Sequence, residues 1–381
     1  MKPISKRRGE RGYALITMAV AAVALLGALG LAVDVGKAFI TKNETQNFCD
    51  AAALSAALWL DGTTTGITTA KSAVTSSTNV WNLGTTKVTT SVTPTVEFAT
   101  ASTGPWVASP SPATNYAYVR VTATVSQPVY FVPVVIANKT TMAVQSRAVA
   151  GQVPITKFPR GLAPYSAIAA NTTGPNFGLT VGNEYDIQWP QFNDTRGGCS
   201  DNNPDKCFNQ PPCKDEPKAN EVKVKNYWAS SNSGYWGSTS NSSIEAEILD
   251  LVQLQAVDVG TNIQPVLTNG TKASEAGYLD ERVSQDTNST DNTVSAYLSH
   301  THNGRRLIAV PIVNPTSTTE TDVVGYGQFL LYTNGSSSNY YTKNTNGNDP
   351  FCAIYAGPYN VGSQSPGTGG SNGATRVKLV Q

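Results

Sequence analysis

Four of the five cysteines lie in the second half of the chain, where their spacing suits covalent cross-linking. Cys199, Cys207 and Cys213 are separated by seven and then five residues, and Cys352 follows far downstream. These gaps are longer than the two to four residues that separate paired ligands in structural zinc sites. We therefore predict two disulfides among these four cysteines, in one of three possible pairings, and an oxidising compartment.

Two other groups have metal-binding atoms, but neither completes a metal-binding pattern. His300 and His302 would lie on one side of a strand, yet no third ligand is evident and a turn sequence follows directly. Asp201, Asp205 and Asp215 miss the Asp-x-Asp-x-Asp-Gly pattern of calcium loops. We expect surface histidines, no bound metal and no cofactor.

Catalytic motifs are missing from the sequence. It contains no Gly-x-Ser-x-Gly elbow, Walker loop, His-Glu-x-x-His or dinucleotide fingerprint. The chain has only two histidines, close together in the sequence, so few residues could be the catalytic base of a Ser/His/Asp hydrolase. Lys and Arg total 27 against 26 Asp and Glu, so no excess of cations is available to neutralise phosphates. The sequence therefore predicts neither an enzyme nor a nucleic-acid-binding protein.

An aromatic cluster, Tyr227, Trp228, Tyr235 and Trp236, falls within a long polar stretch. Such rings either contact a glycan or partner protein or pack their own loop onto the domain. If Trp228 and Trp236 are contact residues, the chain is a membrane-anchored adhesin or carbohydrate-binding surface protein. This is the alternative to the structural role favoured below.

The element that positions all these residues is an apolar segment near the start. Residues 1–12 carry five cations and one Glu, and residues 12–33 carry no charge. At about 1.5 Å per helical residue, this stretch spans the roughly 30 Å of a bilayer's hydrocarbon. We predict a cytoplasmic tail (1–12), a transmembrane helix (13–33) and an exported body. A cleavable signal peptide is the alternative, but its apolar run is usually only about 7 to 15 residues.

The helical pattern continues beyond the apolar segment. Residues 34–62 contain no proline, include an Ala/Leu-rich run that ends at Leu60, and stop at Asp61-Gly62, where Gly supplies a left-handed cap. The whole rod would be about 70 Å long. Small residues along it either allow a partner helix to approach or reflect helix propensity: Gly27, Gly30, Ala52 and Ala56.

The exported body reads as α+β, with a small α+β domain at 63–151, a linker at 152–164 and a β-rich domain with long polar loops at 165–381. In the first domain, a helix near Lys71–Trp81 precedes alternating strands, and Val119, Val121, Ala123 and Val125 should share one face. Further elements follow the proline-rich linker. We predict strands in the first domain at Lys87–Phe98, Tyr116–Ser126 and Thr140–Val149, with a short element at Tyr130–Ala137; strands beyond the linker at Tyr185–Trp189, Arg306–Val313, Val323–Tyr332, Phe351–Tyr355 and Thr375–Val380; and helices there at Ile244–Gln255 and Lys272–Ser284.

The N-terminal residues resemble a known family. Arg11-Gly12 precedes the apolar run, Asp34-Val35-Gly36 marks its exit, and a third block contains Gln46, Asp50, Ala51, Ala53 and Leu54. In this order and spacing, they resemble the N-terminal domain of TadG-like (TadE/TadG) proteins of the Flp pilus-assembly system, over about residues 11–60. Residues 118–150 are similar to the segment that follows in many such proteins. Family members usually have a small residue where this chain has Cys49, which implies a buried thiol.

The resemblance implies a structural function. The chain would be a non-enzymatic, single-pass component of a Flp/Tad-type pilus-assembly or secretion apparatus, with its N-terminus in the cytoplasm and its body periplasmic or extracellular. Its partners would be the lipid bilayer and other pilus-assembly or envelope proteins. The position five residues after Gly12 is Thr17 rather than the Glu of prepilins, so we do not expect prepilin-type processing.

Overall fold

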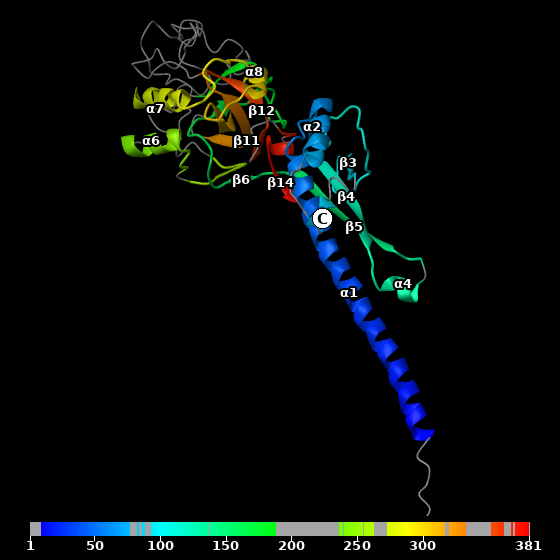
Figure 1. Cartoon of the computed structure of the whole chain (residues 1–381). Coiled ribbons are helices and arrows are strands. Elements are labelled where there is room, and N and C mark those ends of the chain that lie inside the picture. The colour runs from blue at the N-terminus through cyan, green and yellow to red at the C-terminus, as the bar shows by residue number, and fades with distance from the viewer. Residues whose placement is uncertain are drawn as a thin grey trace, which may run out of the picture.

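A single long helix, α1 (Gly9–Ala57), carries a mixed α+β body at its C-terminal end (Figure 1). The predicted α+β fold class, with a long N-terminal helix and a β-rich C-terminal region, is confirmed. The structure is a computed structural model. It describes residues 9–76, 82–83, 86–87, 93–136, 138–187, 236–238, 240–253, 255–262, 273–316, 320–332, 352–361, 367–368 and 370–380. The side chains of residues 9–12 and of some residues within later elements are outside this description.

The two halves of α1 have different surroundings. In the first half, large apolar side chains are exposed, Leu15 at 72% and Leu25 at 64%. The segment from Tyr13 is long and apolar enough to cross a membrane. In the second half, Phe48 and small side chains are fully buried against the body. One continuous helix therefore has a lipid-compatible half and a protein-packed half.

The turn after α1 begins a second helix, α2 (Thr64–Thr75). The Oγ1 atom of Thr63 accepts the N–H of Gly66 at 3.0 Å, and Asp61 Oδ1 accepts the N–H of Thr63 at 2.8 Å. Thr63 is thus an N-cap. The helix predicted near Lys71–Trp81 therefore starts seven residues earlier than expected, because this cap fixes its first turn.

The first sheet packs against the second half of α1 and has the strand order β13-β14-β5-β4-β3. Its β4–β5 hairpin lies along the helix, and the short helix α4 (Val132–Val135) forms the hairpin tip (Figure 1). Val119, Val121, Ala123 and Val125 are buried on one face, as predicted. The strands are β3 (Thr95–Ala99), β4 (Tyr118–Pro128), β5 (Thr141–Pro154), β13 (Tyr359–Val361) and β14 (Ala374–Leu379).

The last strand occupies an unexpected place. A strand at 375–380 was predicted within a separate β-rich domain, whereas β14 pairs antiparallel with β5, from Thr375 opposite Pro154 to Leu379 opposite Ala150. The strand β5 itself runs to Pro154, into the stretch predicted as a linker. Alternation along a strand identifies the strand but not its neighbour, so the sequence pattern did not reveal this pairing.

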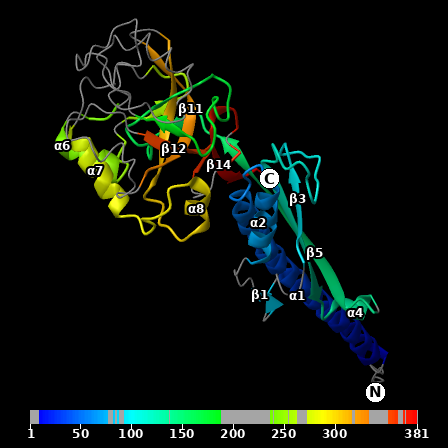
Figure 2. The same ribbon diagram turned by 90° about the horizontal axis from the view of Figure 1, so that it is seen from above.

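The second sheet has the strand order β7-β10-β11-β12-β8, and three helices share its core (Figure 2). Its centre is the antiparallel pair β10–β11. The strands are β7 (Ala167–Ile168), β8 (Glu184–Asp186), β10 (Leu307–Pro315), β11 (Thr321–Leu330) and β12 (Cys352–Gly357). The helices are α6 (Asn241–Leu249), α7 (Ala273–Ser284) and α8 (Val294–Ser299). Smaller elements are the pairs β1 (Asn82–Leu83) with β2 (Thr86–Lys87) and β6 (Lys157–Phe158) with β9 (Val257–Asp258), and η3 (Gly370–Asn372).

The close contact between α1 and the first sheet depends on alanines. Ala53 is fully buried at this contact, whereas the neighbouring Ala51 is half-buried. We predict that Ala53→Leu destabilises the chain by about 1–3 kcal/mol, because the larger side chain overpacks the contact. Ala51→Leu is the matched control and should cost less. Thermal unfolding of the detergent-solubilised chain measures both, and equal losses would show that helix–sheet packing is not the cause.

Candidate functional site

A buried carboxylate joins the membrane-compatible helix to the tip of the β4–β5 hairpin. Asp34 is 1% exposed, although it directly follows the apolar segment. Its Oδ1 accepts the N–H of Tyr130 at 3.0 Å, and its Oδ2 accepts the N–H groups of Phe131 and Val132, both at 2.8 Å. A buried carboxylate requires such donors. Asp34 therefore fixes the hairpin tip at one level of the helix.

A glycine one turn earlier in α1 makes a second contact with the same tip. Gly30 is buried, and a Cβ atom at this position would overlap the ring of Phe131. The absence of a side chain allows the ring to lie against the helix backbone. Gly30 was one of the small residues for which a partner helix was one interpretation. In this structure its neighbour is the chain's own hairpin.

Polar side chains of α1 cover the part of β5 that β14 does not reach. The pairing of β14 with β5 ends at Ala150, and only the Val380 N–H reaches further, to the carbonyl of Val149 at 2.9 Å. Earlier in the strand, Gln46 Nε2 donates to the Arg147 carbonyl at 3.0 Å, and Lys42 Nζ donates to the carbonyl of Gln145. These donors take the place of a neighbouring strand at an otherwise open edge.

The family-type residues beside Gln46 complete this contact. Gln46 Nε2 also donates to Asp50 Oδ1 at 2.8 Å, which orients the amide. Ala53 is buried in the helix–sheet core, and Leu54 packs against that core. Ala51 is half-buried beside them. These residues therefore hold the helix on the sheet.

The free thiol of Cys49 lies inside the same contact. It is fully buried, and its Sγ donates to the Ser146 carbonyl at 3.5 Å. Burial raises the pKa of Cys49 to about 11, so the thiol stays protonated at neutral pH. This environment is that of a small packing residue rather than a nucleophile.

The structure assigns no such contact to Gly36, and it does not describe the side-chain surroundings of Arg11 and Gly12. Gly36 is exposed, and a Cβ there would meet no described atom within 4 Å. Arg11 and Gly12 lie in the first turns of α1, but their side chains are outside the described residues. The structure accordingly explains Asp34 and Gln46 but not Gly36.

Gln152 is a contact residue that the sequence reasoning missed. It is 2% exposed in β5. Its Nε2 donates to the carbonyls of Ala57 and Leu60, at 2.9 and 2.6 Å, and its Oε1 accepts the Thr368 N–H at 2.8 Å. This side chain links the C-terminal end of α1 to the C-terminal part of the chain. It was placed in a linker, where a glutamine gives no local signal of burial.

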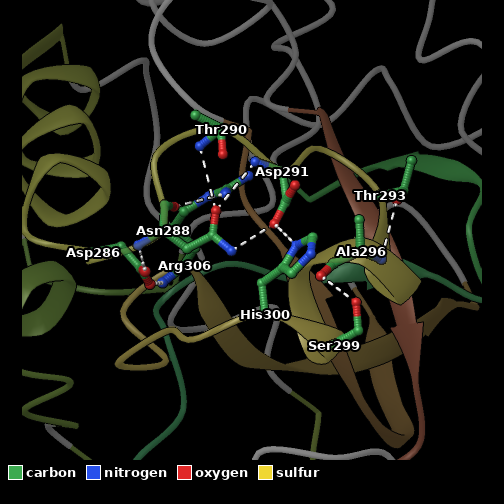
Figure 3. A network of polar contacts seen from close by, with 9 residues as sticks. All are labelled: Asp286, Asn288, Thr290, Asp291, Thr293, Ala296, Ser299, His300 and Arg306. Atoms are coloured by element: carbon green, nitrogen blue, oxygen red, sulfur yellow. Dashed lines mark hydrogen bonds and ion pairs between the residues drawn. The ribbon is translucent and has the colours of Figure 1, made fainter.

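The body also contains a polar cluster beside α8, which Figure 3 shows from close by. Arg306 is fully buried, and its guanidinium donates to Leu331 O at 2.9 Å, to Asn288 O at 3.0 Å and to Asn292 Oδ1 at 2.8 Å. The Tyr297 hydroxyl donates to Asp286 Oδ2 at 2.6 Å. These bonds attach the loop between α7 and α8 to the second sheet.

The histidines belong to this cluster. His300 is exposed and its Nδ1 lies 2.7 Å from Asp291 Oδ2, so the expected surface position is confirmed for it. The hydrogen bond from Asn288, followed by that from His300, keeps the pKa of Asp291 below its usual value. The neighbouring Ser299 hydroxyl donates to the Ala296 carbonyl at 2.9 Å rather than to His300 (Figure 3). His302 stacks on Tyr297 with ring centroids 4.3 Å apart.

The remaining predicted site residues have separate outcomes. Trp236 is only 5% exposed, and its Nε1 donates to the Tyr165 carbonyl at 2.9 Å, so it packs within its own domain and is not a surface contact residue.

Trp228, Cys199, Cys207, Cys213 and the calcium candidates lie outside the described residues. Cys352 begins β12, but its side chain is not described. Among the described residues, no group of three or more His, Cys, Asp or Glu could hold a metal ion.

Comparison with known proteins identifies the N-terminal region. A family model described as "Putative Flp pilus-assembly TadE/G-like" matches residues 12–58. The resemblance seen in the sequence is confirmed for this region, which covers α1 and the carboxylate of Asp34. No curated protein and no solved structure matches the chain.

We predict that Asp34→Ala loosens the hairpin tip while leaving the body folded. Three N–H groups would lose their acceptor, so hydrogen exchange at Tyr130, Phe131 and Val132 should accelerate by about tenfold or more. Asp61→Ala is the matched control, because Asp61 also accepts a backbone N–H but lies far from the tip along α1. Exchange read by mass spectrometry tests this. Unchanged rates at residues 130–132 in Asp34→Ala would contradict the assigned role.

Proposed function

We propose that this chain is a non-enzymatic, single-pass membrane component of a Flp/Tad-type pilus-assembly or secretion apparatus. Its N-terminus lies in the cytoplasm, its helix crosses the inner membrane at residues 13–33, and its body scaffolds partners on the far side. The observation that carries the proposal is the family match to residues 12–58, the residues whose side chains attach the apolar helix to the folded body.

The way the body is attached supports a scaffolding function. The second half of α1 contacts the first sheet through a buried apolar cluster, the side chains of Lys42 and Gln46, and the Gln152 amide. The helix α1 runs unbroken from Gly9 to Ala57, so its apolar first half and the half that packs on the sheet belong to one helix. The helix therefore sets the orientation of the body relative to the bilayer.

A surface for other envelope proteins is present on α1 beyond the apolar segment. Val35, Phe39 and Ile40 are 43, 66 and 59% exposed, although they follow Asp34 and lie beside the packed face of the helix. Exposed apolar side chains at the edge of a packed helix are typical of protein contacts. We assign this surface to another component of the apparatus.

Topology can be tested by labelling two introduced cysteines in spheroplasts with a membrane-impermeant maleimide. We expect Ser126→Cys, on the exposed side of β4, to be labelled in intact spheroplasts and Ser5→Cys only after permeabilisation. Peptide mass spectrometry separates the two positions from the native cysteines. Labelling of Ser5→Cys before permeabilisation would overturn the orientation.

The assembly function can be tested by complementation. Deleting the gene should remove most surface pili, and the full chain should restore them. A chain in which a cleavable signal peptide replaces residues 1–33 should be exported without restoring pili, because the body is no longer held at the membrane. Electron microscopy counts the pili. Normal pili after deletion, or full rescue by the released body, would refute the proposed scaffold.

A further inference from the structure

We propose that the tip of the β4–β5 hairpin is a second membrane contact, which dips into the outer interface of the same bilayer that α1 crosses. The contact consists of the side chains of Tyr130, Phe131, Val132, Pro133 and Ile136, and in this subsection these residues are called the hairpin tip. Its ligand is the lipid surface at the boundary between headgroups and acyl chains. The inference rests on the proposed membrane span of residues 13–33.

The position of the tip along α1 supports this contact. Phe131 lies against Gly30, three residues before the end of the uncharged run, which is about 5 Å along the helix axis. Interfacial segments insert their apolar side chains by roughly 5–10 Å. If residues 13–33 fill the hydrocarbon, Phe131 is already below its boundary. Figure 1 shows the tip beside the middle of α1, where the N-terminal half of the helix continues alone.

The exposure of the tip points in the same direction. Tyr130, Phe131 and Ile136 are 60, 44 and 56% exposed at the end of the hairpin furthest from the body's core. The sequence between them is Val132-Pro133-Val134-Val135, without a charged residue. Three exposed apolar or aromatic side chains within an uncharged run of seven residues are unfavourable in water. The tip contacts α1 at Gly30, between the exposed side chains of Leu29 and Leu31.

Charges around the tip suit a headgroup layer. The Lys37 ammonium lies 4.2 Å from the centroid of the Tyr130 ring, and Lys139 is exposed at the other end of the tip. Tyrosine and lysine are favoured at the interface, where an apolar body and a polar end can both be accommodated. The Asp34 carboxylate is shielded by three N–H donors from the tip. This shielding removes the cost of a free charge at the edge of the hydrocarbon.

Photocrosslinking of the full chain in vesicles of phosphatidylethanolamine and phosphatidylglycerol tests the proposal. The photoreactive residue p-benzoylphenylalanine replaces Ile136 in one sample, Leu25 of the apolar segment in a second, and Val107 in a third. Val107 is 38% exposed in the loop that bridges to β3, outside the hairpin tip. We expect lipid adducts by mass spectrometry at positions 25 and 136, and none at 107.

Each pattern of adducts has one meaning. Lipid adducts at 25 but not at 136 would overturn the tip contact and leave the membrane span intact. Adducts at 136 to a second protein chain would also overturn it, because the tip would then be a protein-docking surface. The absence of lipid adducts at position 25 would refute the membrane span on which the proposed function rests. The variant Ile136→Asp should abolish tip insertion. The reporter is Tyr130→Trp, whose fluorescence is quenched by brominated lipids in the chain that keeps Ile136. Adding Ile136→Asp should reduce this quenching at least twofold.

Discussion

The structure depends on one constraint: a single unbroken helix, α1, has two different surroundings, one along its first part and one along its second part. The first part of α1 exposes apolar side chains such as Leu25, while the later part buries Phe48 and a run of alanines against a sheet. Asp34 lies where these two regimes meet. Its carboxylate is kept inside the protein by three backbone donors, and α1 continues through this position as one helix.

The arrangement of the first sheet around α1 is explained by the need to pair the edges of its strands. The strand β5 pairs with β4 on one side from Thr141 to Gly151, and on the other side β14 covers only its C-terminal part, from Ala150 to Pro154. Lys42 and Gln46 of α1 bond to carbonyls in the part that remains. Gln152 then connects helix, sheet and C-terminal segment through one amide. Residues from three distant parts of the sequence thus complete a single edge.

The sequence predicted the local features well because they depend on periodicity and chain propensity. The uncharged run indicated the long helix, and the alternation from Val119 to Val125 identified the buried face of β4. Non-local features were missed for a physical reason: a pattern of apolar residues does not specify which strand pairs with which. The partner of β14 and the burial of Gln152 both depend on that pairing.

The site residues show the same division. Gln46 and Asp34 were noticed only through the family resemblance. A polar residue on a helix is expected to face water unless its hydrogen-bond partner is known, and the sequence does not give that partner. For Trp236 the sequence left two interpretations, a contact surface or packing onto its own domain, and the burial of its ring with the hydrogen bond to the Tyr165 carbonyl favours packing. The N-cap at Thr63 could have been found from the sequence, because a threonine before Thr64-Thr65-Gly66 is an ordinary start signal.

The late arrival of β14 has a consequence for biogenesis. About 220 residues separate the end of β5 from the start of β14, so at about 5–20 residues per second the ribosome needs roughly 10–40 s to deliver the missing strand. During that interval the first sheet lacks β14, and residues 150–154 of β5 have an unpaired edge. An unpaired strand edge is a template for wrong pairing, so the sheet is most open to misassembly until residue 379 has been synthesised.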